Sequence, residues 1–446
     1  MNMQFDIPVT RSTDVLVIGG GCAGIAAAVC AARHGARVLL AEAGGCLGGM
    51  ATLGLIGPFM TSYDPAGERQ VIRGFFDEFV REMAARGGAV PPEKCHAGDS
   101  YAGYRVAGHD HCASFSPETF KMVAEDLCTA AGVELLYNAH FLRAVLNEAG
   151  DRITGAVFAT KAGLMEIEAA QVIDCTGDAD VAASSGVPFA YGDEAGVTQP
   201  ASLFFTIGGV DKETLERARA ERGQDLTFHA EVKAEIAAGR YHVPRDKVAI
   251  YECPDGTWRV NMSRVQLKDG CDPFEITRAT VDARRQIPEI LDLIRRMVPG
   301  AENAYLVTSA PMLGQRETRR IQGDFILTGD DLKSARRFAD DIFLAGNSID
   351  MHGGSSVNYQ AAKGDAYGVP YRILLPAKVK NLLVAGRSCS LDREALAAIR
   401  VMPPVFAMGQ AAGTAAAMCI KDGGDPAQVD ISALQALLKQ DGAVVE

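Results

Sequence analysis

The chain has 446 residues, of which 48% are hydrophobic and 22% are charged, and its formal net charge is −12. This length is too great for one hydrophobic core, so we expect two domains in a globular protein of ordinary composition. The negative charge, without any run of Lys or Arg, argues against a nucleic-acid partner, because affinity for DNA and RNA depends on neutralising phosphates.

The cysteines and one apolar segment bear on where the protein is found. Eleven cysteines are scattered from Cys22 to Cys419 without a repeated short spacing, which favours a reducing cytoplasm over a disulfide framework. Residues 15–32 form an uncharged run as long as a minimal membrane span. However, this run contains four glycines and splits into a strand-like half and an alanine-rich half. We interpret it as a buried strand, turn and helix, and expect a protein of the cytoplasm without a membrane span.

The first predicted elements form a βαβ unit. The β-branched run 14–18 predicts a strand buried on both faces, residues 22–34 a helix that ends at Gly35, and residues 37–41 a second strand. Between the first strand and the helix lies Gly19-x-Gly21-x-x-Gly24. Glycines at this spacing permit a tight turn, close approach to a pyrophosphate and close helix–sheet packing.

Glu42 ends the second strand, 18 residues beyond Gly24. A carboxylate here can accept hydrogen bonds from ribose hydroxyls and would repel a 2′-phosphate, which argues against NADP. Strand, turn, helix and acidic residue in register predict a dinucleotide site, although the fingerprint does not distinguish NAD from FAD.

The next predicted elements lead into a second domain. We expect helices over 72–86 and 117–131, a long loop over 88–115, and a small β-meander over 133–173 that leads into a strand over 171–175. Residues 200–340 differ in character, with longer charged helices (211–238 and 275–297) and strands near 248–261 and 304–309. The pattern of the first domain, a strand followed by glycine, occurs again at 341–345 and 381–385.

These elements predict an α/β protein with two domains. A doubly wound, Rossmann-like dinucleotide domain is formed by residues 1–200 and 341–446, and an α+β substrate domain, residues 201–340, is inserted into it.

The sequence resembles the FAD-dependent oxidoreductases of the glutathione reductase-type superfamily, and is distantly similar to the fumarate reductase and aspartate oxidase flavoproteins. The likeness rests on four stretches: 14–52, 172–183, 319–328 with 369–372, and 381–388 continuing through 400–414. The last stretch, with Arg400-Val-Met-Pro-Pro404, is the most specific.

The resemblance implies FAD as the cofactor and a set of residues that contact it. The implied contacts come from five segments of the chain. They are Gly19, Gly21, Gly24 and Glu42; Gly48, Gly49 and Met50; Thr176, Gly177 and Asp178; Gly386 and Arg387; and Gly409, Ala411, Ala412 and Gly413. The helix that starts at Pro403 and Pro404 would direct its N-terminus at the flavin and stabilise negative charge on the reduced ring.

The implied activity is hydride transfer between a small polar substrate, of the hydroxy acid, sugar or amine type, and the flavin N5. His352 and Arg372 lie in segments that return to the flavin domain, and Arg316 lies in an arginine-rich stretch. Histidine can exchange a proton near neutral pH, and arginine can clamp an anion by two hydrogen bonds. We therefore take these three residues as candidate catalytic groups, with structural ion pairing as the alternative for each arginine.

Other functions remain open at this point. An NAD-dependent dehydrogenase would carry no flavin, and a flavin-binding sensor would not turn over. The long insertion disfavours the sensor. The sequence does not identify the substrate, the electron acceptor or the oligomeric state. Cys46 has no cysteine close to it in the sequence, which disfavours a disulfide reductase, and no second glycine fingerprint is evident over 190–340.

One loop contains candidate metal ligands. Cys95-His96 and His109-x-His111-Cys112 place soft ligands in the same segment. Neither pair matches a standard zinc spacing, so we expect no metal and interpret the loop as a cover of the substrate pocket.

Overall fold

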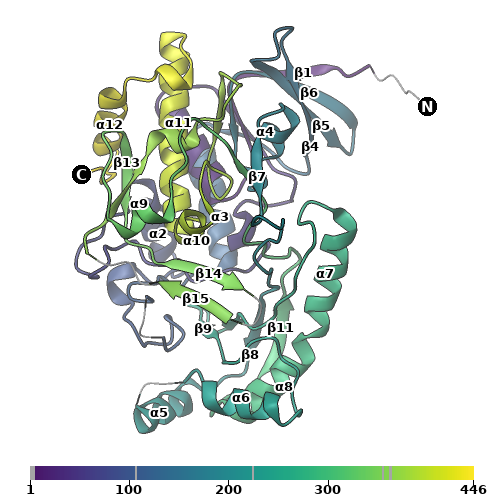
Figure 1. Cartoon of the computed structure of the whole chain (residues 1–446), viewed down its shortest axis with the longest axis vertical. Coiled ribbons are helices and arrows are strands. Elements are labelled where there is room, and N and C mark those ends of the chain that lie inside the picture. The colour runs from purple at the N-terminus through teal and green to yellow at the C-terminus, as the bar shows by residue number, and fades with distance from the viewer. Residues whose placement is uncertain (1–5, 106–107, 224–225, 354–355, 361–363) are drawn as a thin grey trace.

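The computed structural model describes residues 6–105, 108–223, 226–353, 356–360 and 364–446. Its elements divide between two ends of an elongated molecule (Figure 1). The main sheet and the long helix α11 (Met402–Asp422) lie at one end, and α5 (Lys212–Arg222), α6 (His229–Ala237) and α8 (Ile287–Met297) lie at the other.

A seven-stranded sheet forms the core of the first end, in the order β3-β2-β1-β6-β5-β4 with β17 beside β6. Five strands run parallel: β1 (Val9–Ile18), β2 (Val38–Ala41), β3 (Glu134–Leu136), β6 (Gly163–Asp174) and β17 (Leu382–Val384). β4 (His140–Leu146) and β5 (Ile153–Thr160) complete an antiparallel meander with β6. The predicted α/β class with a parallel sheet is confirmed.

Helix α11 packs across α1 (Cys22–Arg33) at very short range. A Cβ atom on Gly409 would lie 2.2 Å from the Ala23 carbonyl oxygen, and one on Gly413 would lie 2.1 Å from that of Ala27. The structure thus places two of the small residues of α11 against α1, and the predicted contact of these residues with the cofactor stays a prediction. Gly409, Ala411, Ala412 and Gly413 are buried, and Gly409 and Gly413 set the distance between the two helices.

The remaining helices on this end cover the other faces of the core. They are α2 (Phe75–Ala85), α3 (Pro117–Ala130), α4 (Asp180–Ser184), α9 (Gly329–Lys333), α10 (Arg393–Ile399) and α12 (Ile431–Gln440). In the described residues, no single helix is long and apolar enough to cross a membrane; α10 and α11 pass that test only together, with a bend of 96° between them.

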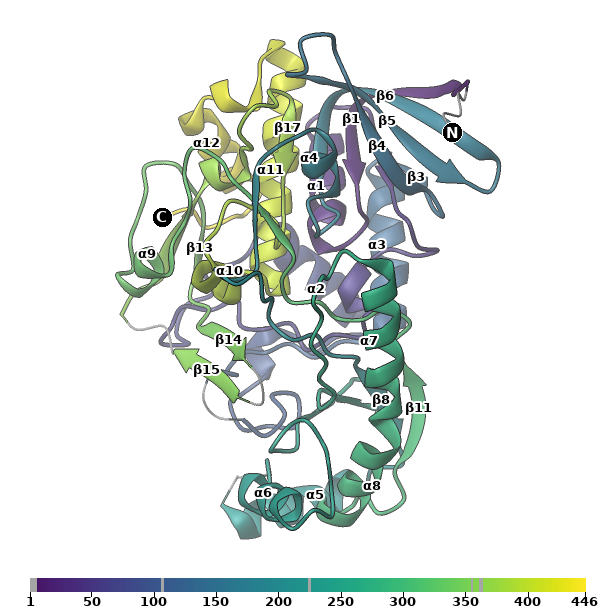
Figure 2. The same ribbon diagram turned by 45° about the vertical axis from the view of Figure 1, so that its right-hand side comes forward.

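The second end is built on a four-stranded antiparallel sheet of order β11-β8-β10-β9. The strands are β8 (Phe205–Gly208), β9 (Ile250–Glu252), β10 (Trp258–Val260) and β11 (Tyr305–Ser309). Each of the two long helices predicted here is two helices. α5 ends at Gly223, which adopts a left-handed conformation with φ of +72°. α7 (Pro273–Arg285) stops before Pro288, which lies in the first turn of α8 and cannot donate a backbone hydrogen bond. Figure 2 shows α7 running between the two ends.

Two large hydrophobic cores match these two ends. The second core gathers residues from 201 to 313 together with Leu55 and Tyr104. The strand β12 (Arg319–Ile321) already pairs with β7 (Phe189–Tyr191), and Leu327 and Leu332 belong to the core around α1 and α11. The predicted boundary at residue 340 stays a prediction, and the packing favours an earlier one.

The C-terminal segment returns to the first end by small sheets of its own. β13 (Asp341–Ala345) pairs with β16 (Tyr367–Pro370), and β14 (Ile349–Gly353) forms a hairpin with β15 (Ser356–Gln360). Of the two segments predicted to resume the first domain, only 381–385 adds a strand, β17, to the main sheet. β13 packs in the same core without joining that sheet.

Candidate functional site

The turn between β1 and α1 is built by close backbone contacts that only glycine allows. A Cβ atom on Gly24 would lie 1.8 Å from the Gly19 carbonyl oxygen, and one on Gly19, whose φ is +102°, would lie 2.4 Å from that of Cys175. At Gly21, by contrast, a Cβ atom would meet no described atom within 4 Å. Gly19 and Gly24 therefore shape the turn, whereas Gly21 leaves space in front of the first turn of α1.

That space has the electrostatics of an anion site. Among the described side chains none caps the N-terminus of α1, whose N-cap residue is Gly21. The free N–H groups and the positive end of the helix dipole therefore face outward. A pyrophosphate is the group that such a helix start accommodates.

Glu42 and the loop after it complete this region. Glu42 is buried and accepts backbone hydrogen bonds from the Gly20 N–H at 2.6 Å and the Gly44 N–H at 2.7 Å. The loop continues to Gly48, whose N–H donates to the Gly20 carbonyl at 2.8 Å. The carboxylate thus ties the glycine turn to the segment 44–50 and keeps lone pairs for further donors.

The end of β6 lies beside this turn and holds an arginine. Asp174 accepts hydrogen bonds from the Thr176 N–H at 3.0 Å and the Thr176 hydroxyl at 2.7 Å, which fixes the start of Thr176-Gly177-Asp178. The Arg387 Nε then donates to the Gly177 carbonyl at 2.6 Å, and its guanidinium pairs with Asp178. Thr176–Asp178 and Gly386–Arg387 therefore form one cluster at the edge of the main sheet.

A cavity of about 680 Å³ opens from this cluster toward the second end of the molecule. Both ends of the molecule contribute to it. Met50, Arg387 and Met402 line it from the side of the glycine turn, and Phe204, Arg245 and Tyr251 line it from the side of the second core. The cavity thus joins residues predicted to bind a cofactor with a pocket that the second core supports.

The polar lining of the cavity is strongly cationic. Six basic residues line it against a single acidic residue, Asp350; they are Arg105, Arg245, Lys247, Arg316, Arg387 and Arg400. Within the described part of the chain no carboxylate lies within salt-bridge distance of Arg245, Arg316 or Arg400, although Arg387 pairs with Asp178. This arrangement attracts an anion into the cavity.

Burial and mutual repulsion perturb these cations. Burial, reinforced by the nearby Arg105 charge, lowers the pKa of Arg245 to about 10. Burial and the Arg400 charge lower the pKa of Arg316 far below its usual value. A bound anion would relieve both costs, because it supplies the opposite charge that these guanidinium groups lack.

Arg316 and Arg400 are held by neutral acceptors. Arg316 donates to the Pro200 carbonyl and, at 3.1 Å, to the Ser202 hydroxyl. Arg400 donates to the Asp350 carbonyl at 2.9 Å, while its Nε has no hydrogen-bond partner among the described atoms. An unsatisfied buried donor is costly, and it favours a ligand that supplies an acceptor.

His352 sits against this cluster but is not free to act as a base. Its Nδ1 accepts from Arg264 at 2.9 Å, so its proton resides on Nε2, which donates to Asp350 at 3.0 Å. Burial and the Arg316 charge lower the pKa of His352 to about 3. Burial alone would raise the pKa of Asp350, yet the His352 hydrogen bond and the nearby arginines hold that pKa well below its usual range. The pair is therefore a neutral imidazole on an ionised carboxylate.

Lys247 is a cavity residue whose proton affinity suits exchange near neutral pH. It lines the cavity and is about half-buried. Burial, together with the charges of Arg105 and Arg245, lowers the pKa of Lys247 to about 8. A lysine in this state can release and take up a proton under ordinary conditions.

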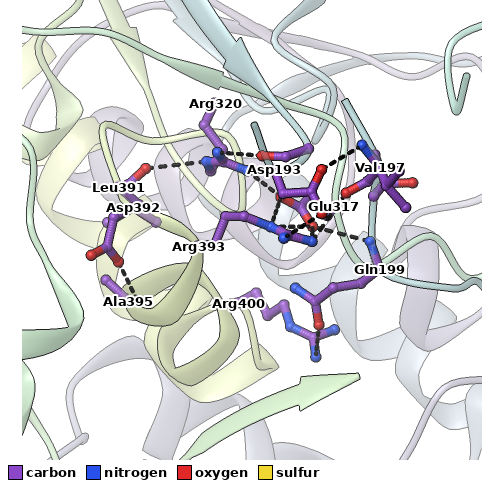
Figure 3. A network of polar contacts seen from close by, with 12 residues as sticks. Asp193, Val197, Gln199, Glu317, Arg320, Leu391, Asp392, Arg393, Ala395 and Arg400 are labelled. Atoms are coloured by element: carbon purple, nitrogen blue, oxygen red, sulfur yellow. Dashed lines mark hydrogen bonds and ion pairs between the residues drawn. The ribbon is translucent and has the colours of Figure 1, made fainter. Parts of the chain in front are cut away.

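An ion-pair network centred on the buried Glu317 lies next to Arg400 of the cavity lining (Figure 3). Glu317 pairs with Arg320 and, at 2.9 Å, with Arg393, and it accepts the Gln199 backbone N–H at 3.1 Å. The Gln199 side-chain oxygen accepts the His352 backbone N–H at 3.1 Å. Glu317 thus anchors residues that touch the cavity wall, and Arg320 serves structure rather than ligand binding.

A family model described as FAD dependent oxidoreductase matches residues 14–438 of this chain. The chain belongs to this family. Its glycine turn, the open helix start at α1 and the cluster at the end of β6 fit a dinucleotide cofactor, and FAD is the cofactor on which the family depends. The suspected family and the FAD cofactor are confirmed at this level.

Two other kinds of similarity accompany the family match. One segment of 42 residues is 57% identical to glutathione reductase from Schizosaccharomyces pombe, a match that spans only 9% of each chain. Among solved structures, the chain is similar to p-nitrophenol 4-monooxygenase PnpA from Pseudomonas putida DLL-E4, with 13% identity, coverage of 96% and 84% and a TM-score of 0.48. It is also similar to the myxobacterial chondrochloren halogenase CndH, with 13% identity, coverage of 97% and 79% and a TM-score of 0.46.

In this FAD-dependent oxidoreductase the three residues predicted to be catalytic do not all lie in the cavity. His352 and Arg316 line the cavity, whereas Arg372 does not. The Arg372 side chain lies over the ring of Phe325, 4.2 Å from its centroid, and pairs with Asp340 at 3.5 Å. The structure therefore does not bring Arg372 to the cavity, and its catalytic role stays a prediction. It lies in the short helix 371–374, where its side chain packs on two partly buried phenylalanines, Phe325 and Phe338.

The sequence analysis missed most of the basic residues of the cavity. Arg245 and Lys247 lie in a loop of the inserted segment, and nothing in their local pattern distinguishes them from surface residues. Arg400 belongs to the family-like stretch, where it was noted only as part of a motif. Residues such as these become candidates once the fold brings them to one cavity.

Proposed function

We propose that this FAD-dependent oxidoreductase oxidises a small anionic substrate, of the hydroxy acid or amino acid type, in the cavity beside the cofactor. The excess of positive charge carries the proposal: six basic residues and one acidic residue line the cavity. With a neutral sugar, Asp350 would be the one negative charge of the described lining against these cations, and a substrate carboxylate would reduce that shortage.

The cofactor would be held by the glycine turn and its neighbours. Gly21 and the first turn of α1 would receive the pyrophosphate, and Glu42 would receive a ribose. Gly48, Gly49 and Met50, with Thr176–Asp178 and with Gly386 and Arg387, would contact the remainder. Bound FAD would supply a two-electron acceptor, its N5 taking the hydride from the substrate carbon.

The residues of the cavity would bind the substrate and accept its proton. Arg316 and Arg400 would bind the carboxylate, and the Asp350–His352 pair would keep Arg264 and Arg400 in place through its hydrogen bonds. Lys247 would take the proton that the substrate hydroxyl or ammonium group loses when the carbon gives up its hydride. This balances the oxidation: two electrons and one proton leave as hydride, and the second proton goes to Lys247.

This assignment moves the proton acceptor away from His352. The His352 Nδ1 faces a guanidinium that only donates, and its Nε2 is committed to Asp350. Protonating this ring would place two donors against each other. We therefore propose His352 as a positioning residue, and Lys247 as the group that exchanges the proton. A distant relation to fumarate reductase and aspartate oxidase stays a prediction.

Anaerobic reduction of the protein-bound flavin tests the substrate class. Each 2-hydroxy acid or amino acid is compared with its own amide, which keeps the reacting C–H bond and loses the negative charge. We expect the acid to bleach the flavin at least about 10-fold faster than its amide at equal concentration, because a charge-assisted pair is worth about 1.5–3 kcal/mol. Equal rates for acid and amide, or bleaching only by neutral sugars or by NADH, would refute the proposal.

A further inference from the structure

A second cluster of polar groups lies outside the cavity, where the segment 59–71 meets the long loop after α2. The side chains of His96, Asp110 and His111 present ligand atoms that all lie within 4.8 Å of one another. The two buried cysteines of the same loop, Cys95 and Cys112, are not among them. The sequence suggested Cys and His as candidate metal ligands, whereas the structure brings together two imidazoles and a carboxylate.

The hydrogen bonds of His111 point to a missing positive charge. The His111 Nδ1 lies 3.0 Å from the Pro92 carbonyl oxygen. A carbonyl only accepts, so Nδ1 carries the hydrogen and the Nε2 of a neutral ring carries a lone pair. That lone pair faces a second carbonyl oxygen, of Gly67, at 3.0 Å and the Asp110 carboxylate oxygen at 3.5 Å. Three acceptors turned toward one point repel one another unless a proton or a cation lies between them.

The spacing of these acceptors fits a metal ion. Around a tetrahedral zinc ion, ligand atoms about 2.0–2.2 Å from the metal lie about 3.3–3.6 Å from one another. The distance from the His111 Nε2 to the Asp110 carboxylate oxygen, 3.5 Å, falls in this range, and the Gly67 carbonyl oxygen, at 3.0 Å, lies slightly closer. His96 brings its ring to 6.1 Å from that of His111, centroid to centroid and nearly perpendicular, so a nitrogen of each ring can reach a shared ion.

The surrounding structure fixes the ligands before any ion arrives. The ring of Tyr63 stacks on His111 with centroids 3.8 Å apart. The other Asp110 oxygen accepts the Ala97 N–H at 2.9 Å. A metal-binding histidine typically donates its second ring N–H to a backbone carbonyl, as His111 does to Pro92. These partners limit the rotation of both side chains, which lowers the entropy cost of binding.

We propose that His96, Asp110, His111 and the Gly67 carbonyl form a binding site for a divalent cation of the zinc type. Two imidazoles and one carboxylate favour zinc over magnesium or calcium, which prefer oxygen ligands alone. The ion would join the segment 59–71 to the loop that carries Arg105 and His109 into the cavity wall. The proposal departs from the expectation of no metal, and it does not depend on the proposed substrate.

Zinc titration of the flavin-loaded protein, after treatment with a chelator, tests the site. We expect one saturable equivalent per chain, and cobalt(II) in its place should show the visible bands of a four-coordinate ion. His96→Gln should weaken zinc binding by on the order of 100-fold, because it removes one ligand at an exposed position with little effect on folding. Asp110→Asn, which keeps the shape of the side chain, should also weaken it.

A matched control comes from another exposed histidine. His242 lies in the inserted segment, far along the chain, and is largely exposed. His242→Gln should leave zinc affinity unchanged. The proposal is overturned if no saturable zinc binds, if His96→Gln and His242→Gln bind zinc equally, or if NMR finds the His111 ring doubly protonated at neutral pH in the presence of zinc.

Discussion

The two regions proposed to bind ligands differ in what they are made of. The region around the turn between β1 and α1 is made of backbone. It is packed so closely that a Cβ atom on Gly24 would lie only 1.8 Å from the Gly19 carbonyl oxygen. The cavity is made of long charged side chains from segments as far apart as Arg105 and Arg400. As proposed, the first region would bind through N–H groups and a helix dipole, and the second through guanidinium groups.

This difference indicates that cofactor binding and substrate specificity depend on separate parts of the protein. A turn of glycines is suited to a pyrophosphate, whatever substrate the enzyme acts on. A cavity of arginines serves one class of substrate, since each guanidinium must meet an acceptor. Changes in the first region should therefore affect the cofactor whatever the substrate, whereas changes in the second should affect one substrate class and leave the cofactor in place.

The largest expected effect is at Gly21. The structure leaves open space where its Cβ would lie, so Gly21→Val should fold with the stability of the parent. It should nevertheless weaken FAD binding by on the order of 1000-fold (about 4 kcal/mol), because the side chain fills the space proposed for the pyrophosphate. Flavin absorbance per chain measures this after gel filtration.

Gly424→Val provides the control for Gly21→Val. Gly424 also has no described atom within 4 Å of its Cβ position, and it lies after α11, away from the turn. This variant should keep both its stability and its FAD. If Gly21→Val keeps its flavin, the pyrophosphate lies elsewhere and the backbone region does not bind the cofactor as proposed.

The backbone region could be predicted because its signals lie close together in the sequence. Strand, glycines, helix and Glu42 occupy residues 14–42, and the spacing alone places them in one unit. The helix break at Pro288 was also available from the sequence and was not used. By contrast, Arg372 was misplaced because a residue after a strand can point to either side, and only its stacking on Phe325 decides which.

The cavity could not be predicted because its parts come from separate loops. Arg245 and Lys247 belong to a segment without regular structure, and Arg316 and Arg400 are 84 residues apart by their numbers. Their convergence depends on tertiary packing, as does the loss of proton affinity at His352. Sequence reasoning chose a histidine because of its ordinary pKa, and burial beside Arg316 and Arg400 removes that property.

The second expected effect concerns Lys247 and pH. The pKa of Lys247 is lowered to about 8, so the neutral amine that accepts a proton forms as the pH rises through this value. The kcat/KM for oxidation, which reports the free enzyme, should therefore rise with pH and level off above about 8. Lys247→Met should lower the rate of flavin reduction by about 10²–10⁴-fold and abolish this step in the pH profile.

Lys233→Met is the matched control, because Lys233 lies exposed on α6 in the same part of the chain. This variant should keep the parental pH profile and rate. If the Lys247→Met protein retains the step near pH 8, another group exchanges the proton, and the proposed role of Lys247 is wrong.

The smallest of the three effects separates two arginines that sequence reasoning had grouped together. Arg316→Gln removes a guanidinium that lines the cavity, while Gln keeps most of the length of the side chain and can still donate to the Ser202 hydroxyl. The KM for an anionic substrate should rise by about 10–100-fold, the loss of one charge-assisted pair of about 1.5–3 kcal/mol, with a smaller change in kcat. The KM for the matching amide should change little, because the amide carries no charge for Arg316 to bind.

Arg372→Gln removes a guanidinium that is 42% exposed and stacked on Phe325, so it should leave both KM values unchanged and alter only stability, within about 1 kcal/mol. Both variants should retain stoichiometric FAD. If Arg372→Gln raises the KM for the acid as much as Arg316→Gln does, the substrate does not bind in this cavity. If Arg316→Gln raises the KM for acid and amide alike, Arg316 shapes the cavity without recognising charge.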